Sequence, residues 1–253
     1  MIDLTRRGNV AVLTLSRPPV NALDAEMLAA IHGALDTLPQ HAGCTVLQIR
    51  STTKVFVAGA DISYMCAMTG KPNPGAEMTA YLEPFQGLFK RIESLPQVVI
   101  AEVNGAALGG GFELALACDL RYAAHEAKLG LPEVGLGLIP GAGGTQRLTR
   151  LCGRGLAGRL IYGAEPVDGA TALSLGMVQW ACPRAELEEN TKALADRISA
   201  LPVLALQAAK ACVQAFGNPA VDGYKMEIDK MEKLIASADA KNRMTTFLER
   251  SKK

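Results

Sequence analysis

The chain has 253 residues, of which 49% are hydrophobic and 20% are charged. A chain of this length and apolar content can bury one large core, which excludes disordered, collagen-like and coiled-coil proteins. With 26 basic and 25 acidic residues the formal net charge is +1, so the charge balance gives no sign of a nucleic-acid or membrane-surface protein.

The six cysteines are scattered, without a CxxC pair or another spacing typical of metal ligands. We therefore expect reduced thiols rather than structural zinc or a disulfide framework. The first residues lack the apolar block of a signal peptide, and no run approaches the roughly 18 apolar residues of a membrane span. These features predict a cytoplasmic protein that binds neither membrane nor nucleic acid.

Apolar patterning predicts an α/β layered core. Three apolar runs are typical of buried strands, at residues 10–15, 45–49 and 98–103. Asp24 is a good N-cap for a helix whose apolar residues recur at helical spacing. Residues 71–75 contain two prolines and a glycine and predict a flexible loop, so the surrounding segment is a candidate substrate lid.

Beyond about residue 184 the pattern changes to helices alone, at residues 187–201, 203–216 and 221–236. We therefore predict a core over residues 1–190, which holds the active site, and a helical region over residues 191–253. Apolar positions in the last helices predict that the chain self-associates.

Two glycine-containing segments are candidates for binding through the backbone. In residues 56–62, small side chains let N–H groups approach a ligand, and Asp61 can cap the next helix. Residues 104–113 lead from a strand through a glycine run into a helix, whose first turn offers free N–H groups to an oxyanion. Glu113 lies just inside this helix. A tight turn and a dipole-complementing glutamate are the purely structural alternatives.

A third segment, residues 129–145, surrounds Glu133 with apolar and small residues. Burial there favours the neutral acid, whereas a solvent-facing loop glutamate is the alternative. Gly135 and Gly137 resemble the start of a dinucleotide-binding motif, but Pro140 occupies its third glycine position, which excludes that interpretation.

Together the segments predict two backbone donors facing one oxygen and two glutamates facing one another. This arrangement suits chemistry through an enolate, because the donors stabilise charge that develops on a thioester oxygen. One carboxylate takes a proton from water, and its protonated partner gives one to carbon.

On these segments the sequence resembles the enoyl-CoA hydratase (crotonase) superfamily over nearly its whole length. The resemblance is most specific at Ala58-Gly59-Ala60-Asp61, at residues 107–115, and at Pro132-Glu133 followed by residues 139–148. It implies a spiral of ββα turns with a helical C-terminal region that builds homotrimers or dimers of trimers. It also implies a lyase of fatty acid metabolism and β-oxidation.

The resemblance further implies the site residues. Glu113 and Glu133 occupy the two glutamate positions, the N–H groups of Ala58 and Gly110 form the oxyanion hole, and the Gly141 N–H helps to hold a water. The substrate is expected to be an acyl-CoA thioester, with no metal or redox cofactor. The expected substrate contacts are Val20, Ala22, Ala58, Gly59, Ala60, Asp61, Ile62, Gly109, Gly110 and Pro132.

The sequence departs from the family pattern at Leu129 and Leu131, where relatives often carry Phe and Gln, so the approach to Glu133 is more aliphatic. Tyr64, Met65 and Met68 are candidates for lining the acyl pocket. A basic stripe, Arg147, Arg150 and Arg154, is interpreted as a solvated helix face or an inter-subunit contact.

Two alternatives stay open beside a hydratase. A Δ3,Δ2-enoyl-CoA isomerase needs only one carboxylate and no attacking water, so the presence of both glutamates favours hydration. An RNA-binding protein of the same fold is disfavoured by the net charge and by the lack of a dense Lys/Arg helix.

Overall fold

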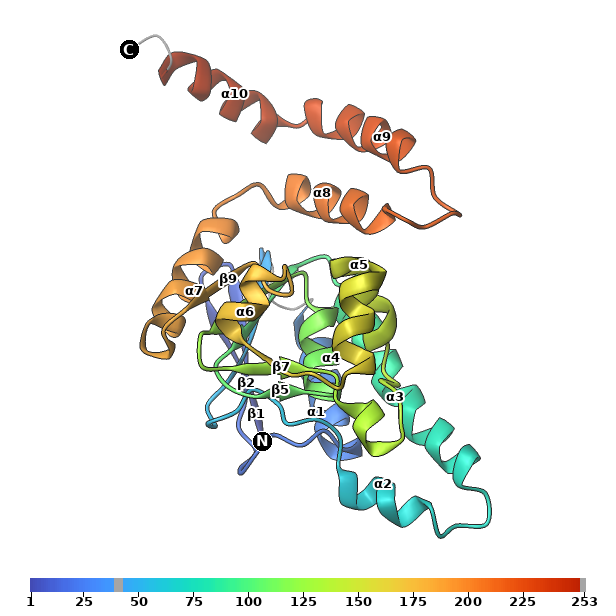
Figure 1. The fold of residues 1–253 in the computed structure, drawn as a ribbon. Coiled ribbons are helices and arrows are strands. Elements are labelled where there is room, and N and C mark those ends of the chain that lie inside the picture. Colours follow the sequence, from blue (N-terminus) through green and yellow to red (C-terminus); the bar gives the residue numbers. More distant parts are fainter. Residues whose placement is uncertain (39–42, 251–253) are drawn as a thin grey trace.

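The main sheet of the computed structural model has six strands in the order β1-β2-β3-β4-β6-β9 (Figure 1). The structure describes residues 1–38 and 43–250. Only β1 and β2 pair antiparallel, and all other neighbours are parallel. The six strands are β1 (Ile2–Arg7), β2 (Val10–Leu15), β3 (Val46–Ser51), β4 (Val98–Val103), β6 (Leu120–Ala124) and β9 (Trp180–Cys182).

A smaller sheet pairs three short strands in the order β5-β7-β8. They are β5 (Ala107–Leu108), β7 (Lys128–Gly130) and β8 (Val167–Asp168). β5 and β7 are parallel, and their register pairs Leu108 with Gly130. Since β5 leads into one candidate segment and β7 into the other, this sheet brings the two segments together.

The central strands form because they are apolar on both faces. β2 and β3 are buried at every position but one, as expected for parallel strands covered on both sides by helices. The predicted strands at 10–15 and 98–103 match β2 and β4, and β3 begins one residue later than predicted and ends two later.

Helices connect and cover these strands. They are α1 (Ala25–Thr37), α2 (Ile62–Met68), α3 (Pro74–Ser94), α4 (Gly110–Ala117), α5 (Gly144–Tyr162), α6 (Gly169–Ser174), α7 (Arg184–Ser199), α8 (Val203–Ala215), α9 (Gly223–Ile235) and α10 (Ala238–Arg250), with a 3-10 turn, η2 (Glu133–Leu136). Asp24 caps α1 as predicted, because its side chain accepts from the Met27 N–H at 2.9 Å. The predicted α/β fold is confirmed.

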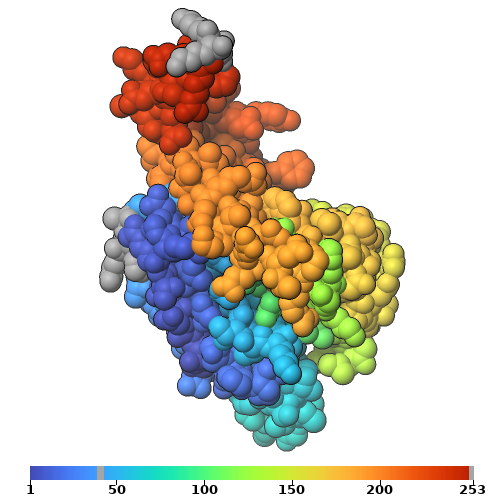
Figure 2. Space-filling model, turned by 90° about the vertical axis from the view of Figure 1, so that its left-hand side faces the viewer, coloured from blue at the N-terminus to red at the C-terminus, as the bar shows by residue number. Residues whose placement is uncertain are grey.

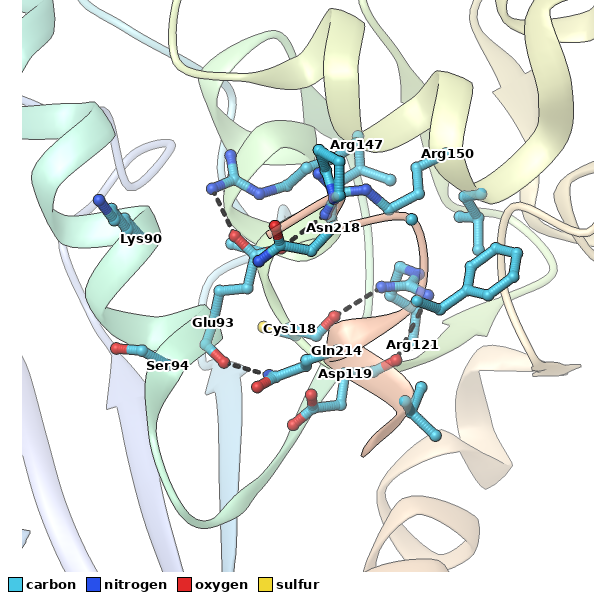
Figure 3. Close-up of a pocket in the computed structure, with 17 residues that line it drawn as sticks. Lys90, Glu93, Ser94, Cys118, Asp119, Arg121, Arg147, Arg150, Gln214 and Asn218 are labelled. Carbon is cyan, nitrogen blue, oxygen red and sulfur yellow. Dashed lines mark hydrogen bonds and ion pairs between the residues drawn. The ribbon is translucent and has the colours of Figure 1, made fainter. Parts of the chain in front are cut away.

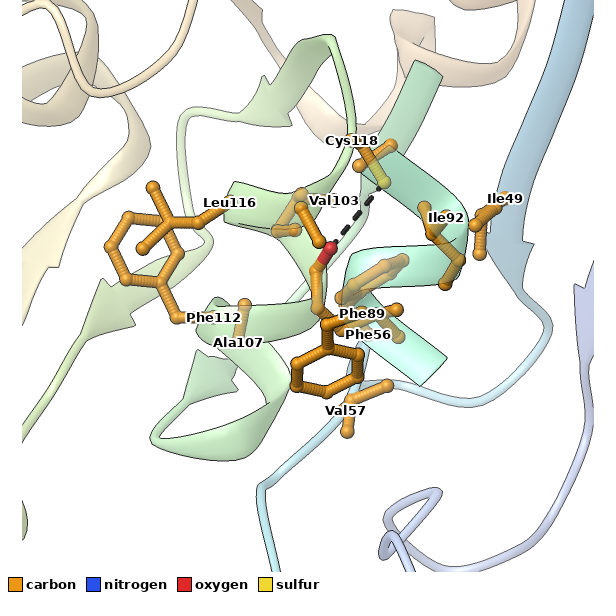
Figure 4. Packing of buried hydrophobic residues seen from close by; sticks show 14 of the residues in the cluster. Ile49, Phe56, Val57, Phe89, Ile92, Val103, Ala107, Phe112, Leu116 and Cys118 are labelled. Atoms are coloured by element: carbon orange, nitrogen blue, oxygen red, sulfur yellow. Dashed lines mark hydrogen bonds between the residues drawn. The ribbon is translucent and has the colours of Figure 1, made fainter. Parts of the chain in front are cut away.

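The two faces of the main sheet have separate cores. The larger core includes buried residues of α1, α3 and α4, and Figure 4 shows Phe89 and Ile92 of α3 close to residues of α4. On the other face, Leu194 and Ala195 of α7 pack with Val10, Val46 and Ile100 of the strands. α4 is buried along its whole length, so any polar group on it lies inside the protein.

The predicted loop at residues 71–75 is wrong at its end, because Pro74 and Gly75 already belong to α3. Asn73 caps this helix by accepting from the Ala76 N–H at 3.2 Å. Proline suits the first turn of a helix, where its missing N–H would have no partner. The same proline that indicated a loop therefore begins a helix of 21 residues.

The C-terminal helices differ in how they contact the core. α7, α8 and α9 confirm the three predicted helices to within three residues. The predicted boundary at residue 190 falls inside α7, whose buried face includes Leu187 and Leu194. In contrast, α9 and α10 have no buried residue, and they project from the rest of the molecule (Figures 1 and 2). Residues 251–253 lie outside the described part of the chain.

Within residues 1–38 and 43–250, no single helix has the length and apolar character to cross a membrane. One pair of helices, α7 and α8, meets these criteria only when taken together, and the pair is bent by 105°. Four residues of α7 are buried within the protein.

Candidate active site

The first carboxyl of the site is that of Glu113, in the first turn of α4. Its residue is only 3% exposed. Its Oε1 accepts two backbone hydrogen bonds, from the Ala142 N–H at 2.8 Å and from the Gly144 N–H at 2.7 Å. Such bonds stabilise the ionised form of a carboxyl.

Gly143 creates the turn that aims these two N–H groups at one oxygen. Its φ of +101° lies in the left-handed region that favours glycine. Alternation of right- and left-handed residues makes successive N–H groups converge, which forms an anion-binding concavity. Gly144 is also the first residue of α5, so Glu113 faces the positive end of that helix.

The second carboxyl is that of Glu133, which opens η2 directly after Pro132. A Cβ atom on Gly109 would lie 3.0 Å from Glu133 Oε1, so the side chain of Glu133 lies against the glycine turn that begins α4. Glu133 Oε2 is buried and has no hydrogen-bond partner among the described residues. A buried oxygen without a donor favours the protonated acid.

Burial raises the pKa of Glu113 from its ordinary value of 4.5 to about 7. This value includes the effect of the Glu133 charge, which also raises the pKa, and of the N–H groups of Gly144 and Ala142 and the charge of Arg147, which lower it. Burial also raises the pKa of Glu133. The two carboxyls therefore interact, and ionisation of one opposes ionisation of the other.

Two backbone N–H groups, those of Ala60 and Gly110, lie at the start of α4. A Cβ atom on Gly110 would lie 3.6 Å from the Ala60 nitrogen, which shows how closely the two backbones approach. Within the described residues neither the Ala60 N–H nor the Gly110 N–H donates to a partner. Gly59, directly before Ala60, has a φ of +112°, and a side chain there would meet the Leu108 carbonyl at 2.8 Å.

The prediction that the Ala58 N–H belongs to the oxyanion hole is wrong. This N–H donates to the Val20 carbonyl at 3.0 Å and is therefore already engaged. Gly59, with a φ of +112°, changes the direction of the chain after Ala58, and the Ala60 N–H beyond it donates to no partner among the described residues. The geometry assigns to Ala60 the place that was predicted for Ala58.

A family model described as enoyl-CoA hydratase/isomerase matches residues 5–253. The chain belongs to the enoyl-CoA hydratase/isomerase family. It is similar to a probable enoyl-CoA hydratase of Bacillus subtilis (strain 168), with 41% identity over 96% of this chain and 93% of the relative. It is also similar to the crotonyl-CoA hydratase of Syntrophomonas wolfei, with 39% identity over 99% and 96% of the two chains.

A solved structure of the enoyl-CoA hydratase from Bacillus anthracis has the same fold as this family member, with a TM-score of 0.89. The two sequences are 33% identical, and the similarity covers 98% of this chain and 96% of the other. The crotonase-like fold expected from the sequence is thereby confirmed.

Most predicted site residues of this family member lie together. Glu113, Glu133, Gly109 and Gly110 meet where β5 and β7 end. Val20 and Ala22 lie beside residues 58–60, since the Leu23 N–H donates to the Gly59 carbonyl at 3.0 Å. The role predicted for Gly141 stays a prediction; its carbonyl accepts from Gln86 Nε2 at 2.7 Å.

Residues of α2 have a different relation to the site. The carboxylate of Asp61 caps α2 by accepting from the Tyr64 N–H at 3.1 Å, as predicted. Ile62 is 53% exposed, and Met68 is buried. The Tyr64 ring packs on Tyr81 of α3, with 5.3 Å between centroids. The predicted acyl-pocket roles of Tyr64, Met65 and Met68 stay predictions.

Sequence reasoning missed the residues just before and at the beginning of α5 that bind Glu113. Ala142 and Gly144 supply its donors, and a Cβ on Gly144 would meet both Glu113 Oε1 at 2.9 Å and Leu131 Cδ1 at 3.0 Å. The glycine run at 141–144 was the available signal, because a repeated glycine indicates a close backbone approach. Among residues 1–38 and 43–250, no group of three or more His, Cys, Asp or Glu is placed to hold a metal ion.

Proposed function

We propose that the chain is an enoyl-CoA hydratase, a lyase that adds water reversibly across the 2,3 double bond of an enoyl-CoA to give a 3-hydroxyacyl-CoA. The observation that carries this proposal is the pair of interacting carboxyls, Glu113 and Glu133, beside the unengaged N–H groups of Ala60 and Gly110. Relatives named crotonyl-CoA hydratase and short-chain-enoyl-CoA hydratase, 39% and 36% identical, support it.

Glu113 is the general base and Glu133 the general acid. Two N–H donors and the charge of Arg147 favour the carboxylate of Glu113, whereas Glu133 Oε2 has no donor in the described part of the chain. When Glu133 is protonated, its repulsion of the Glu113 charge is absent. We therefore assign the proton of the working pair to Glu133. Because the pKa of Glu113 is raised to about 7, only part of the molecules have Glu113 ionised at neutral pH, and this part is the one that reacts.

Hydration then proceeds with each proton accounted for. Water attacks the β-carbon while its proton passes to Glu113, and the π electrons move toward the thioester oxygen. The N–H groups of Ala60 and Gly110 donate to this oxygen as it becomes negative, which lowers the barrier. Glu133 then gives its proton to the α-carbon, and the thioester carbonyl re-forms.

The turnover ends with Glu113 protonated and Glu133 ionised, so one proton must return from the first carboxyl to the second. Exchange with solvent restores the starting state. The reverse sequence removes water from the 3-hydroxyacyl-CoA through the same groups, because both directions share one transition state.

The test is the loss of conjugated-thioester absorbance when the protein meets crotonyl-CoA, with the product identified by mass. We expect a water adduct with the native chain, and a rate lower by about 10²- to 10⁴-fold in Glu113→Gln and in Glu133→Gln. Glu102→Gln is the matched control, because Glu102 is 2% exposed but belongs to the α7 face of the sheet, where it lies 3.7 Å from Arg50 Nε. Absence of any adduct would contradict the proposal.

The same assay separates hydration from Δ3,Δ2 isomerisation. A 3-enoyl-CoA gains conjugated absorbance when its double bond migrates, and its mass does not change. We expect hydration of crotonyl-CoA to be the faster reaction, because migration uses one carboxyl whereas the site has two. Migration without a 3-hydroxyacyl product would establish the isomerase.

We propose further that the chain assembles as a homotrimer or a dimer of trimers. In support, α9 and α10 carry exposed apolar side chains but no buried residue: Ile228, Met231, Ile235, Phe247 and Leu248. Such faces are usually covered by another protein surface. Sedimentation velocity should give species of three or six chains, and a monomer at micromolar concentration would contradict this assembly.

The remaining expectations also stay proposals. They are a cytoplasmic location, no metal or redox cofactor, and no nucleic-acid partner. The relatives' names support the acyl-CoA class of substrate without deciding the length of the acyl chain.

A further inference from the structure

The turn that binds Glu113 is itself held from its outer side. Its Ala142 N–H and Gly144 N–H donate to Glu113 Oε1, whereas the Ala142 carbonyl accepts from Arg147 Nη1 at 3.0 Å. The same short segment is thus bound on one side by the carboxyl and on the other by a guanidinium. Any shift of the carbonyl would also move the two N–H groups beside it.

Arg147 is not the solvated residue that its place in a basic stripe suggested. Its side chain is only 12% exposed, and its Nη2 donates to Glu93 Oε2 of α3 at 3.0 Å (Figure 3). A Cβ on Gly143 would clash with Arg147 Nη1, so the glycine also makes room for the guanidinium against the turn. Two features of Gly143, its positive φ and its missing side chain, therefore serve the same arrangement.

α3 supports this turn in two ways, one direct and one through Arg147. Glu93 holds Arg147, and Gln86 Nε2 donates directly to the Gly141 carbonyl at 2.7 Å. These two residues are seven apart and so lie on one face of the helix. α3 thereby fixes the outer side of residues 141–142, while α4 supplies Glu113 on the inner side.

We propose that Arg147, held by Glu93, is a positioning residue of the hydration reaction, which fixes the 141–144 turn and keeps the Glu113 carboxyl ready to accept the proton of water. This inference rests on the proposed function. The Arg147 side chain donates to the Ala142 carbonyl and to Glu93, so in this proposal it acts through the turn and through its charge.

The charges around the site agree with this role. Two charged groups contribute to the raised pKa of Glu113, Glu133 by raising it and Arg147 by lowering it. Around Arg147 itself lie Glu93 of α3 and, further along α5, Arg150. Loss of the Arg147 charge should therefore raise the pKa of Glu113 and leave less carboxylate at neutral pH.

Arg150 offers a matched control. Its Nη1 donates to Glu93 Oε1 at 3.2 Å, so it shares the carboxylate that binds Arg147. It is 62% exposed and donates to no atom of the 141–144 turn. Arg150→Gln and Arg147→Gln thus remove the same charge from the same helix, and only the second releases the turn.

The experiment measures kcat, KM and the pH dependence of crotonyl-CoA hydration in both variants. For Arg147→Gln we expect kcat to fall by about 10- to 100-fold with KM nearly unchanged, because a small displacement of a catalytic group has effects of this size. The acidic limb of the pH–rate profile of Arg147→Gln should move to higher pH. Arg150→Gln should resemble the native protein, and an equal effect of both variants would overturn the proposal.

Two further variants separate the turn from the charge. Gln86→Met releases the Gly141 carbonyl without changing any charge, so kcat should fall while the acidic limb stays in place. Arg147→Lys keeps the charge but has a shorter side chain. The acidic limb of its pH–rate profile should therefore move less than that of Arg147→Gln. If Arg147→Gln does not fold, these two variants still decide the proposal, since native kcat in both would overturn it.

A readout without turnover keeps this proposal distinct from the proposed function. The carboxyl infrared band of Glu113, identified by its loss in Glu113→Gln, can be titrated with no substrate present. It should titrate at higher pH in Arg147→Gln than in the native protein, and at an unchanged pH in Arg150→Gln. A native protein that does not hydrate crotonyl-CoA refutes the function, whereas an unchanged Glu113 titration in Arg147→Gln refutes the role of Arg147.

Discussion

The two glutamates of the site have the same side chain but opposite surroundings. Glu113 belongs to a fully buried helix, and two N–H groups bind its Oε1. Glu133 opens a 3-10 turn whose next residues are exposed, and its Oε2 has no partner among the described residues. The comparison teaches that the environment, not the residue type, distinguishes the two carboxyls, and this difference is the basis on which we propose one as the base and the other as the acid.

The difference arises from the backbone segment that each carboxyl contacts. Glu113 reaches across to the beginning of α5, where the Gly143 turn presents its N–H groups. Glu133 instead lies against Gly109, whose backbone offers it no donor. Three variants test this contrast, from the largest expected effect to the smallest.

The largest effect is expected on stability in Glu113→Gln. Because the folded pKa of Glu113 is about 7 and its ordinary value is 4.5, the unfolded chain loses this proton first as the pH rises. The native protein should therefore lose up to about 3 kcal/mol of its free energy of unfolding between about pH 4.5 and pH 7. Urea unfolding at several pH values should show that this loss is missing in the variant.

The outcome that would contradict this prediction is an equal pH slope in the native protein and in Glu113→Gln. Glu133→Gln should change the slope in the same direction, since burial raises the pKa of Glu133 as well. Glutamine can still accept the two N–H bonds of the turn, so the variant isolates the charge from the hydrogen bonds.

The second largest effect is expected on kcat, from steric crowding of the Glu113 carboxyl with no change of charge. A Cβ in Gly144→Ala would come within 2.9 Å of Glu113 Cγ and Oε1, so the carboxyl must move. We expect kcat for crotonyl-CoA to fall by about 100-fold, which corresponds to about 2.7 kcal/mol. Steady-state kinetics with circular dichroism as a folding control would measure it.

Gly141→Ala is the matched control for this variant. The nearest atoms to its Cβ would all belong to the flexible side chain of Leu82, with Cδ1 at 2.8 Å and Cδ2 at 3.0 Å. Because alanine keeps the backbone N–H and carbonyl of residue 141, we expect kcat to fall much less than in Gly144→Ala. Equal losses in the two alanine variants would show that the turn is merely intolerant of side chains, and that the position of Glu113 is not what matters.

The smallest effect concerns a carboxylate outside the pair. Asp61 caps α2, and its replacement by alanine should lower the free energy of unfolding by about 1 kcal/mol. Since its side chain has this structural role, KM for crotonyl-CoA should stay within about twofold, an energy difference well under 1 kcal/mol. A much larger rise in KM would instead support the substrate contact predicted from the sequence.

Much of the arrangement of this site could be predicted from the sequence because its residues belong to short local segments. Glu113, Glu133 and Gly110 each belong to a short segment with its own glycine pattern, and β2 and β4 follow from apolar runs. The choice between Ala58 and Ala60 could not be made locally. It depends on the Val20 carbonyl, a partner that lies 38 residues earlier in the chain.

The role of Arg147 was hidden for the same reason. Its partner Glu93 lies 54 residues away on a helix whose beginning, at Pro74, had the composition of a loop. A basic residue every three or four positions is typical of a solvated helix face. The ion pair between Arg147 of α5 and Glu93 of α3 overrides that pattern. Contacts between distant segments thus decide what spacing along the chain leaves open.

The assignment of Glu133 as the acid and Glu113 as the base is tested most directly by isotope exchange in D₂O. The substrate for this test is a saturated acyl-CoA, which cannot be hydrated. Removal of its α-proton uses only the group that delivers this proton during hydration. We predict that mass spectrometry will show α-deuteration by the native chain and by Glu113→Gln, and none by Glu133→Gln. Exchange that persists in Glu133→Gln and stops in Glu113→Gln would contradict the assignment of acid and base.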